Sequence, residues 1–158
     1  DVYKRQVINP ANAMHAMEQG IRFYERYFER KWSRSLNMKK EAFPELYGGE
    51  DWHHIRSLRE RTHYLATRHA GFESADEYFE GYSIADDRLA VLRVPATVLT
   101  AADDPIVPVR DFHELPDNPA LELLISDYGG HCSFLKNWKF ESLAEDLVAE
   151  RFNAVTIA

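Results

Sequence analysis

The chain has 158 residues, 45% of them hydrophobic, which is enough for one packed domain or for a piece of a larger one. Its 19 basic and 26 acidic residues give a formal net charge of −7, so the overall field disfavours nucleic acid as a partner. A single cysteine, Cys132, excludes an intrachain disulfide, and we expect a cytoplasmic location. No apolar run approaches the roughly 20 residues of a transmembrane helix, so stable membrane insertion is not expected.

The beginning of the chain is difficult to interpret. Residues 1–6 follow no clear pattern, and we leave them unassigned or treat them as a non-native join. Residues 7–8 are interpreted as the end of a buried strand, followed by Asn9 as the N-cap of a helix over Pro10–Gln19. The chain begins with Asp rather than Met, and we expect an amino-terminal part to precede it.

Residues 21–40 combine aromatic side chains at helical spacing with a local excess of positive charge. Seven basic and two acidic residues give a local charge of +5 (7 − 2) in an otherwise acidic chain. Such a helix can contact a membrane surface peripherally or close over an apolar substrate. The simpler interpretation is an amphipathic helix that buries its aromatic face and keeps its charges solvated.

Two further helices are predicted over residues 52–70 and 75–82, with Ser74 as the N-cap of the second. Paired glycines precede the first helix, and a glycine-containing turn separates the two. Residues 7–92 are therefore predicted to contain the end of a core strand and then a helical cap or lid.

Four histidines in this region raise the hypothesis of a metal site: His53, His54, His63 and His69. Adjacent histidines on a helix point about 100° apart, no H-E-x-x-H pattern occurs, and carboxylates at ligand spacing are not evident. We expect surface or half-buried histidines, and we predict neither a metal nor another cofactor.

The pattern changes after residue 93. Ala96–Ala101 and Leu121–Ser126 are near-continuous apolar runs, typical of strands that are covered on both faces. A short helix over residues 109–115 would join them as a parallel pair with a right-handed crossover, and residues 141–152 favour a final amphipathic helix. Two parallel strands do not make a stable sheet, so residues 93–158 are predicted to be the carboxyl-terminal part of a larger α/β core.

An acid and a histidine follow the two predicted strands. Asp104 and His131 are 27 residues apart (131 − 104), which leaves room for one crossover helix and one strand. Because the carboxyl ends of parallel strands meet at one edge, the two side chains can come together. A carboxylate that accepts a hydrogen bond from imidazole fixes its tautomer and stabilises the imidazolium formed in nucleophilic catalysis. Asp103 is the alternative acid.

Three neighbouring side chains have simpler interpretations. Cys132 adjoins the histidine, but in an extended loop it would point away from it, so a small buried thiol is expected rather than a nucleophile. Phe134 and Trp138 are expected to be packing anchors rather than ligand contacts.

The two loops resemble those of a known superfamily. The sequence A-A-D-D-P-I-V-P at residues 101–108 is similar to the acid loop of α/β-hydrolases, and G-G-H-C-S-F at residues 129–134 resembles the histidine loop of their YheT-type branch. The resemblance implies Asp104 as the triad acid and His131 as the triad base. In the D-x-x-x-P form of the family the acid stands four residues before a proline, here Pro108, which favours Asp104 over Asp103.

The resemblance extends over about residues 7–152. Residues 70–79 resemble the helical cap of that branch, and residues 24–28 and 32–36 resemble the basic helix that precedes it. It implies a carboxyl-terminal fragment of an α/β-hydrolase fold, with a helical cap, the last two or three parallel strands and flanking helices.

The family places its serine nucleophile upstream on a G-x-S-x-G elbow, and no such motif occurs in the chain. The resemblance implies part of a serine hydrolase, like a carboxylesterase or lipase, that acts on a small-molecule or lipid-like ester through an acyl-enzyme. The fragment alone would be inactive. Dehalogenase-like and epoxide-hydrolase-like relatives use Asp as nucleophile, so its identity stays open. A non-catalytic interaction module of the same fold is the alternative, and the sequence leaves no trace of oligomeric state.

Overall fold

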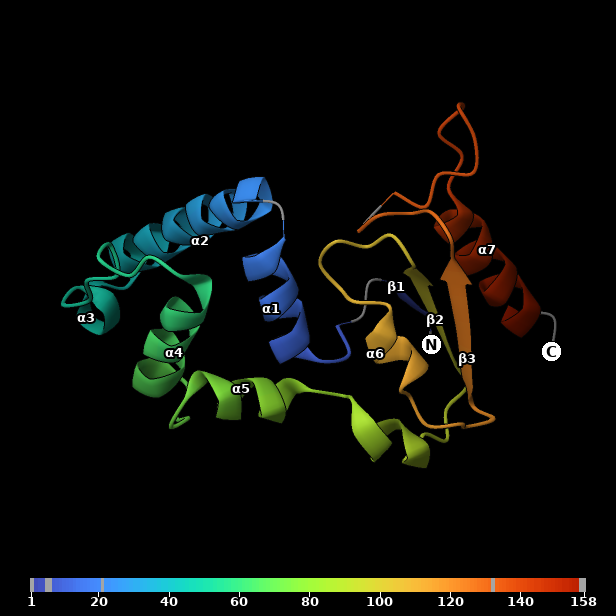
Figure 1. Ribbon diagram of the computed structural model, residues 1–158, viewed down its shortest axis with the longest axis horizontal. Helices are drawn as coiled ribbons and strands as arrows, with labels where there is room; N and C mark the ends of the chain where they lie inside the picture. Colours follow the sequence, from blue (N-terminus) through green and yellow to red (C-terminus); the bar gives the residue numbers. More distant parts are fainter. Residues whose placement is uncertain (1, 5–6, 21, 132, 157–158) are drawn as a thin grey trace. The chain divides into compact units, whose positions relative to one another are not determined.

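A computed structural model describes residues 2–4, 7–20, 22–131 and 133–156. The chain divides into two compact units. The core unit comprises Asp1–Ala13 and Ser83–Ala158, and the helical unit comprises Met14–Tyr82. Figure 1 shows strands in the first and only helices in the second. The helical unit lies within the longer segment, residues 7–92, that the sequence assigned to a strand end and a cap.

The core unit is built on three parallel strands in the order β1-β2-β3: β1 (Val2–Lys4), β2 (Ala96–Ala101) and β3 (Leu121–Ser126). All six residues of β2 are buried, as expected for a central strand. The predicted parallel pair is confirmed, with the predicted bounds. An α/β fold with parallel strands is thus present, consistent with the carboxyl-terminal part of an α/β-hydrolase.

Helices cover this sheet. A short helix, α6 (Arg110–His113), lies on the crossover between β2 and β3, and α7 (Leu143–Thr156) follows β3. Figure 1 shows these two helices on opposite sides of the strands. Buried side chains of β2 and α7 form one cluster with a loop phenylalanine: Leu99, Ala101, Phe134, Ala144 and Leu147. The core therefore lies directly beneath the loops that follow β2 and β3.

The strand end predicted at residues 7–8 is not a strand. The strand lies earlier, at Val2–Lys4, within the segment that was left without an element. Ile8 is fully buried, and its carbonyl accepts hydrogen bonds from the Ile84 amide at 2.9 Å and the Ser83 hydroxyl at 3.3 Å. Ile8 is apolar because it is buried in the segment that connects β1 to the first helix, not because it belongs to a strand.

Two helices begin at the N-cap residues that the sequence predicted. In α1 (Pro10–Gln19) the first turn is capped by Asn9, whose Oδ1 accepts from the amides of Ala11 at 3.0 Å and Asn12 at 3.2 Å. In α5 (Ala75–Tyr82) the Ser74 hydroxyl accepts from the Glu77 amide at 3.0 Å. The bounds of both helices are as predicted.

The other helices differ from prediction at their ends. A long helix, α2 (Arg22–Ala42), is followed by the short α3 (Pro44–Tyr47). The helix predicted over residues 52–70 is α4 (Leu58–His69), because Ser57 caps its first turn by accepting from the Glu60 amide. A short 3-10 helix, η1 (Asp86–Val91), precedes β2 along the chain.

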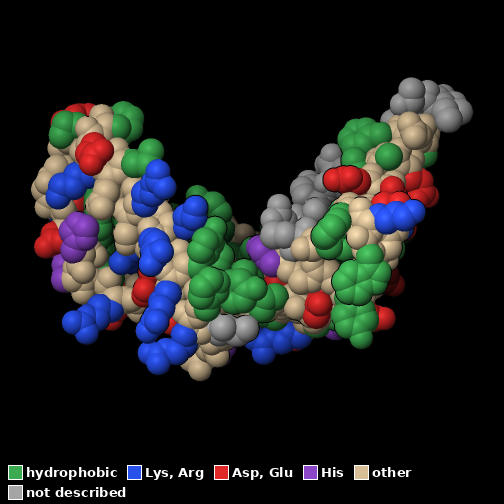
Figure 2. Space-filling model, turned by 90° about the horizontal axis from the view of Figure 1, so that it is seen from above, with side chains coloured by type: hydrophobic (Ala, Val, Ile, Leu, Met, Phe, Trp, Pro, Cys, Tyr) green, Lys and Arg blue, Asp and Glu red, His purple; other side chains and the backbone are tan. Residues whose placement is uncertain are grey.

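The aromatic stripe of α2 faces the interior of the helical unit. Leu36 is buried with Trp52 and Ile55, and Trp32 packs against this cluster. Most basic residues of α2 are exposed, and Lys and Arg side chains spread over the helical unit in Figure 2. This is the predicted amphipathic arrangement, although Phe23 and Tyr27 remain largely exposed.

Glu50 is a buried residue that contacts two helices of this unit, α4 through its carboxylate and α2 through its backbone carbonyl. Glu50 accepts hydrogen bonds from the Tyr64 hydroxyl and from Arg68 Nε at 3.1 Å, and its Oε1 lies 3.3 Å from His69 Nε2. Its backbone carbonyl accepts from Lys40 Nζ at 2.6 Å. Burial opposes the ionisation of Glu50, but the Tyr64 hydrogen bond and the charges of Arg68 and His69 outweigh it, so its pKa lies below 4.5.

Glu50→Gln should therefore destabilise the protein at pH 7 by about 2 kcal/mol, because charge-assisted hydrogen bonds are lost from a buried site. A lowered folded-state pKa contributes stability above the unfolded value, and this contribution disappears as pH falls through the folded pKa. The difference in Tm between wild type and variant, followed by circular dichroism, should shrink below pH 4.5. Glu45→Gln, on the exposed side of α3, is the control. A Tm difference that is constant with pH would contradict this assignment.

Candidate active site

Asp104 lies in the loop that follows β2 and is held by its own backbone. Its Oδ1 accepts hydrogen bonds from the amides of Ile106 at 2.8 Å and Val107 at 3.0 Å. Ile106 and Val107 are buried, so their side chains anchor the loop in the core. The Asp104 side chain is only 3% exposed. Its carboxylate thus has a fixed position before any contact with histidine is considered.

His131 lies in the loop that follows β3 and faces Asp104. Its Nδ1 is 3.0 Å from Asp104 Oδ2 and 3.2 Å from Oδ1, so the predicted contact at adjacent strand ends is present. Because a carboxylate only accepts, the geometry favours the tautomer with the proton on Nδ1. Its side chain is 29% exposed, and Nε2 forms no hydrogen bond with a described residue. Nε2 can therefore act as the base.

Asp103, the alternative acid, makes different contacts from Asp104. Its Oδ1 accepts hydrogen bonds from the backbone amides of Gly129 at 2.9 Å and Gly130 at 2.7 Å. The two adjacent carboxylates thus contact successive parts of one loop: Asp103 holds the glycines, and Asp104 meets the imidazole of His131. Of the two candidate acids, Asp104 is the one whose carboxylate contacts His131.

The two glycines before His131 are needed for different reasons. A Cβ on Gly129 would lie 2.9 Å from Phe134 Cδ1 and 3.0 Å from Ala101 Cβ, so a side chain there would collide with the core. Gly130 has φ +52° and open space around its Cβ position, so it meets a conformational requirement instead. The loop therefore needs glycine at position 129 for close packing and at position 130 for its left-handed backbone conformation.

Gly129→Ala should destabilise the core unit by about 2 kcal/mol through overpacking. Gly130→Ala should cost about 1 kcal/mol, because only the left-handed conformation opposes it. Urea unfolding followed by fluorescence measures both changes. Equal losses, or a larger loss at Gly130, would show that the Gly129 site can relax around a methyl group.

The structure tests the expectations for two of the three residues near His131 that were expected to be structural. Phe134 is buried in the core cluster, as expected, but the expectation for Trp138 is wrong, since it is 99% exposed. Its apolar character suggested packing, yet the loop before α7 projects it into solvent. Cys132 lies outside the described residues. No hydrogen bond joins a serine hydroxyl to His131 anywhere in the described ranges.

The four histidines between residues 53 and 69 do not converge. His53 and His54 are exposed, His63 Nδ1 accepts from the Ala75 amide at 3.3 Å, and His69 pairs with Glu50. Within the described residues, no three His, Cys, Asp or Glu side chains are grouped to hold a metal ion. Nor does any helix in the described part of the chain have the length and apolar character needed to span a bilayer.

Besides Glu50, sequence reasoning missed a second buried carboxyl group. Asp111 in α6 is 3% exposed; its Oδ1 accepts from Asn12 Nδ2 at 2.8 Å, and its Oδ2 has no partner in the part of the chain described. Burial raises the pKa of Asp111 despite this hydrogen bond and the nearby charge of Arg110. The contact joins α6 to α1, and its 99-residue sequence separation left no local signal.

Comparison with known proteins points to one superfamily. The chain is 30% identical to a medium-chain fatty acid ethyl ester synthase/esterase 2 of Saccharomyces cerevisiae over 58% of its length, which is 21% of that protein. It is 29% identical to the human protein ABHD15 over 84% of the present chain. It is 27% identical to the human phospholipase ABHD3 over 75% of the present chain. Each human match covers 29% of the relative.

These relatives are α/β-hydrolase family members, and the similarity supports that superfamily at low identity. Names of two of them indicate hydrolase-like function at the family level. The chain spans less than a third of the length of the relatives it matches. No protein-family model and no solved structure matches it.

Proposed function

We propose that this chain carries the acid and the base of a serine hydrolase that cleaves carboxylic esters through an acyl-enzyme. The observation that carries the proposal is the contact of buried Asp104 with His131 Nδ1 at 3.0 Å, at the carboxyl ends of neighbouring parallel strands. Similarity to an esterase and a phospholipase supports it. Within the superfamily, the G-G-H-C-S-F loop favours the YheT-type branch, and the substrate is a small-molecule or lipid-like ester.

The reaction assigns each residue a proton-handling role. His131 Nε2 takes the proton of the attacking hydroxyl, while the carbonyl carbon of the ester bonds to the hydroxyl oxygen. The proton then passes from Nε2 to the leaving alkoxide, and the acyl-enzyme remains. In the second half, Nε2 takes a proton from water as the water oxygen bonds to the acyl carbon. Nε2 then returns this proton to the nucleophile oxygen as its bond to the acyl carbon breaks and the acid is released. Asp104 holds Nδ1 and stabilises the imidazolium in both halves.

The nucleophile is proposed to come from outside these 158 residues, because they contain no G-x-S-x-G motif. An elbow serine would meet Nε2, with backbone amides near it forming the oxyanion hole. An aspartate nucleophile, as in dehalogenase-like members, would use the same histidine to activate water. The 158-residue chain by itself is then expected to be inactive.

The test compares the 158-residue chain with the protein encoded by its full coding region, using short-chain p-nitrophenyl esters. The longer protein should hydrolyse the ester and react with a fluorophosphonate probe on serine, and the shorter chain should do neither. Activity of the short chain that His131→Ala abolishes would refute the external nucleophile. A longer protein that folds but has no hydrolytic activity on an ester series would instead support a non-catalytic interaction module.

A further inference from the structure

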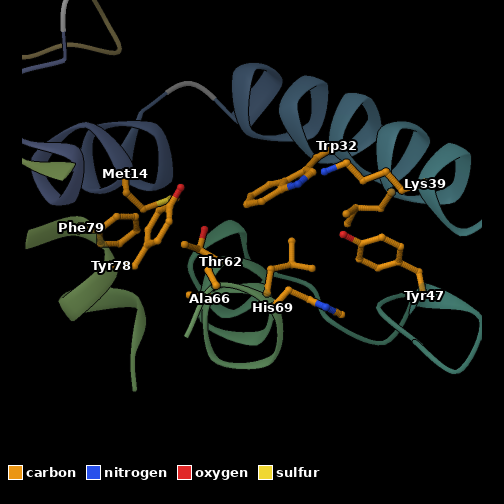
Figure 3. Close-up of a pocket in the computed structure, with 12 residues that line it drawn as sticks. Met14, Trp32, Lys39, Tyr47, Thr62, Ala66, His69, Tyr78 and Phe79 are labelled. Atoms are coloured by element: carbon orange, nitrogen blue, oxygen red, sulfur yellow. The ribbon is translucent and has the colours of Figure 1, made fainter. Parts of the chain in front are cut away.

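The helical unit contains a cavity of about 430 Å³, a size within the usual range of small-molecule sites. It opens among α1, α2, α4 and α5, and its walls are largely apolar. Figure 3 shows Met14, Tyr78 and Phe79 at one end, and Trp32 and Tyr47 toward the other. None of the residues that line this cavity is assigned a role in the proposed reaction.

The lining residues with nitrogen-containing ionisable side chains lie toward the end with Trp32 and Tyr47. Lys39 and His69 line the cavity there (Figure 3). His69 is already engaged, because its Nε2 lies 3.3 Å from the buried Glu50 carboxylate and its ring packs 4.8 Å from that of Tyr47. Lys39 is exposed, and its ammonium makes no hydrogen bond or ion pair with a described residue. Its ammonium is therefore the charge available to a ligand.

The lining contains no carboxylate among the described residues. An anionic group at Lys39 is therefore not repelled by a negative side chain of the cavity wall. A single lysine supplies one positive charge, which matches a singly charged carboxylate. The described lining contains no arginine that could bind a phosphate through two parallel hydrogen bonds. The apolar remainder of the cavity requires an equally apolar body for the ligand, because polar groups there would lose their hydrogen bonds to water.

We propose that this cavity binds the anion of an unbranched fatty acid. The carboxylate lies at Lys39, and the hydrocarbon chain extends past Trp32 and Leu65 toward Met14 and Phe79. Binding involves no step of ester hydrolysis and needs neither Asp104 nor His131. The proposal therefore stands or falls independently of the proposed catalytic function.

Isothermal titration calorimetry with the full 158-residue chain tests this site, with octanoate, decanoate, dodecanoate and dodecanol as ligands below their micelle concentrations. The carboxylates should bind with 1:1 stoichiometry and tighten by up to about fourfold per added methylene. Dodecanoate should bind more tightly than dodecanol. Absence of saturable dodecanoate binding, or equal affinity for dodecanol, would overturn the proposal.

Two variants locate the ligand. Lys39→Met keeps the aliphatic stem and should weaken dodecanoate binding about threefold without changing dodecanol binding, as expected for an exposed ion pair. Lys31→Met, also exposed on α2 but outside the cavity, is the matched control and should change neither. Leu65→Trp should fill the cavity and abolish binding of both ligands.

Circular dichroism checks that each variant is folded. If Leu65→Trp does not fold, the Lys39→Met and Lys31→Met pair decides. Equal effects of these two lysine variants on dodecanoate binding would place the carboxylate elsewhere and overturn the assignment.

Discussion

Replacing Asp104 with asparagine should lower kcat for ester hydrolysis by about 10³- to 10⁴-fold in the protein encoded by the full coding region. Asparagine is close in shape, so the loop should survive. Its amide nitrogen, however, can donate to Nδ1 and favour the wrong imidazole tautomer, and the charge that stabilises the imidazolium is lost. Steady-state kinetics with a short-chain p-nitrophenyl ester measures the change, and KM should move little because Asp104 does not contact substrate.

Asp103→Asn is the matched control for this prediction. Asparagine Oδ1 can still accept from the Gly129 and Gly130 amides, which lie 2.9 and 2.7 Å from the present carboxylate oxygen. We therefore expect kcat to fall less than about tenfold, through small changes in loop position. If Asp103→Asn abolished activity and Asp104→Asn did not, the assignment of the triad acid would be wrong.

Replacing Trp52 with alanine should destabilise the helical unit by about 4 kcal/mol. Trp52 is 1% exposed and packs with Leu36 and Ile55, so its removal leaves a large cavity that the surrounding helices cannot fill. The change also removes the hydrogen bond from Trp52 Nε1 to Asn37 Oδ1 at 3.2 Å. Urea unfolding followed by far-ultraviolet circular dichroism gives the loss in unfolding free energy.

Trp138→Ala is the control for tryptophan removal itself. Because Trp138 is 99% exposed, its replacement should change the unfolding free energy by no more than about 0.5 kcal/mol. A large loss for Trp138→Ala would show that this side chain packs in solution. A small loss for Trp52→Ala would show that the helical unit does not depend on this cluster.

Local sequence patterns were sufficient for the elements that carry the site. Ala96–Ala101 and Leu121–Ser126 were predicted at their observed bounds because near-continuous apolar runs favour strands. The expected burial on both faces is present in Ala96–Ala101 but not in Leu121–Ser126, whose residues are half-buried or exposed. Asn9 and Ser74 marked helix starts because capping requires only a few adjacent residues. The strand end predicted at residues 7–8 was wrong because buried apolar residues occur in connecting segments as well as in strands.

The sequence by itself determined that an acid and a histidine follow two neighbouring strands in the order used by α/β-hydrolases. Only the tertiary structure showed that Asp104 contacts the imidazole while Asp103 holds the glycines. Adjacent aspartates have the same chemistry, and their directions depend on which amides lie 26 and 27 residues away. The Glu50 cluster and the cavity beside Lys39 were likewise invisible in sequence, because helix packing brings together side chains that no local periodicity connects.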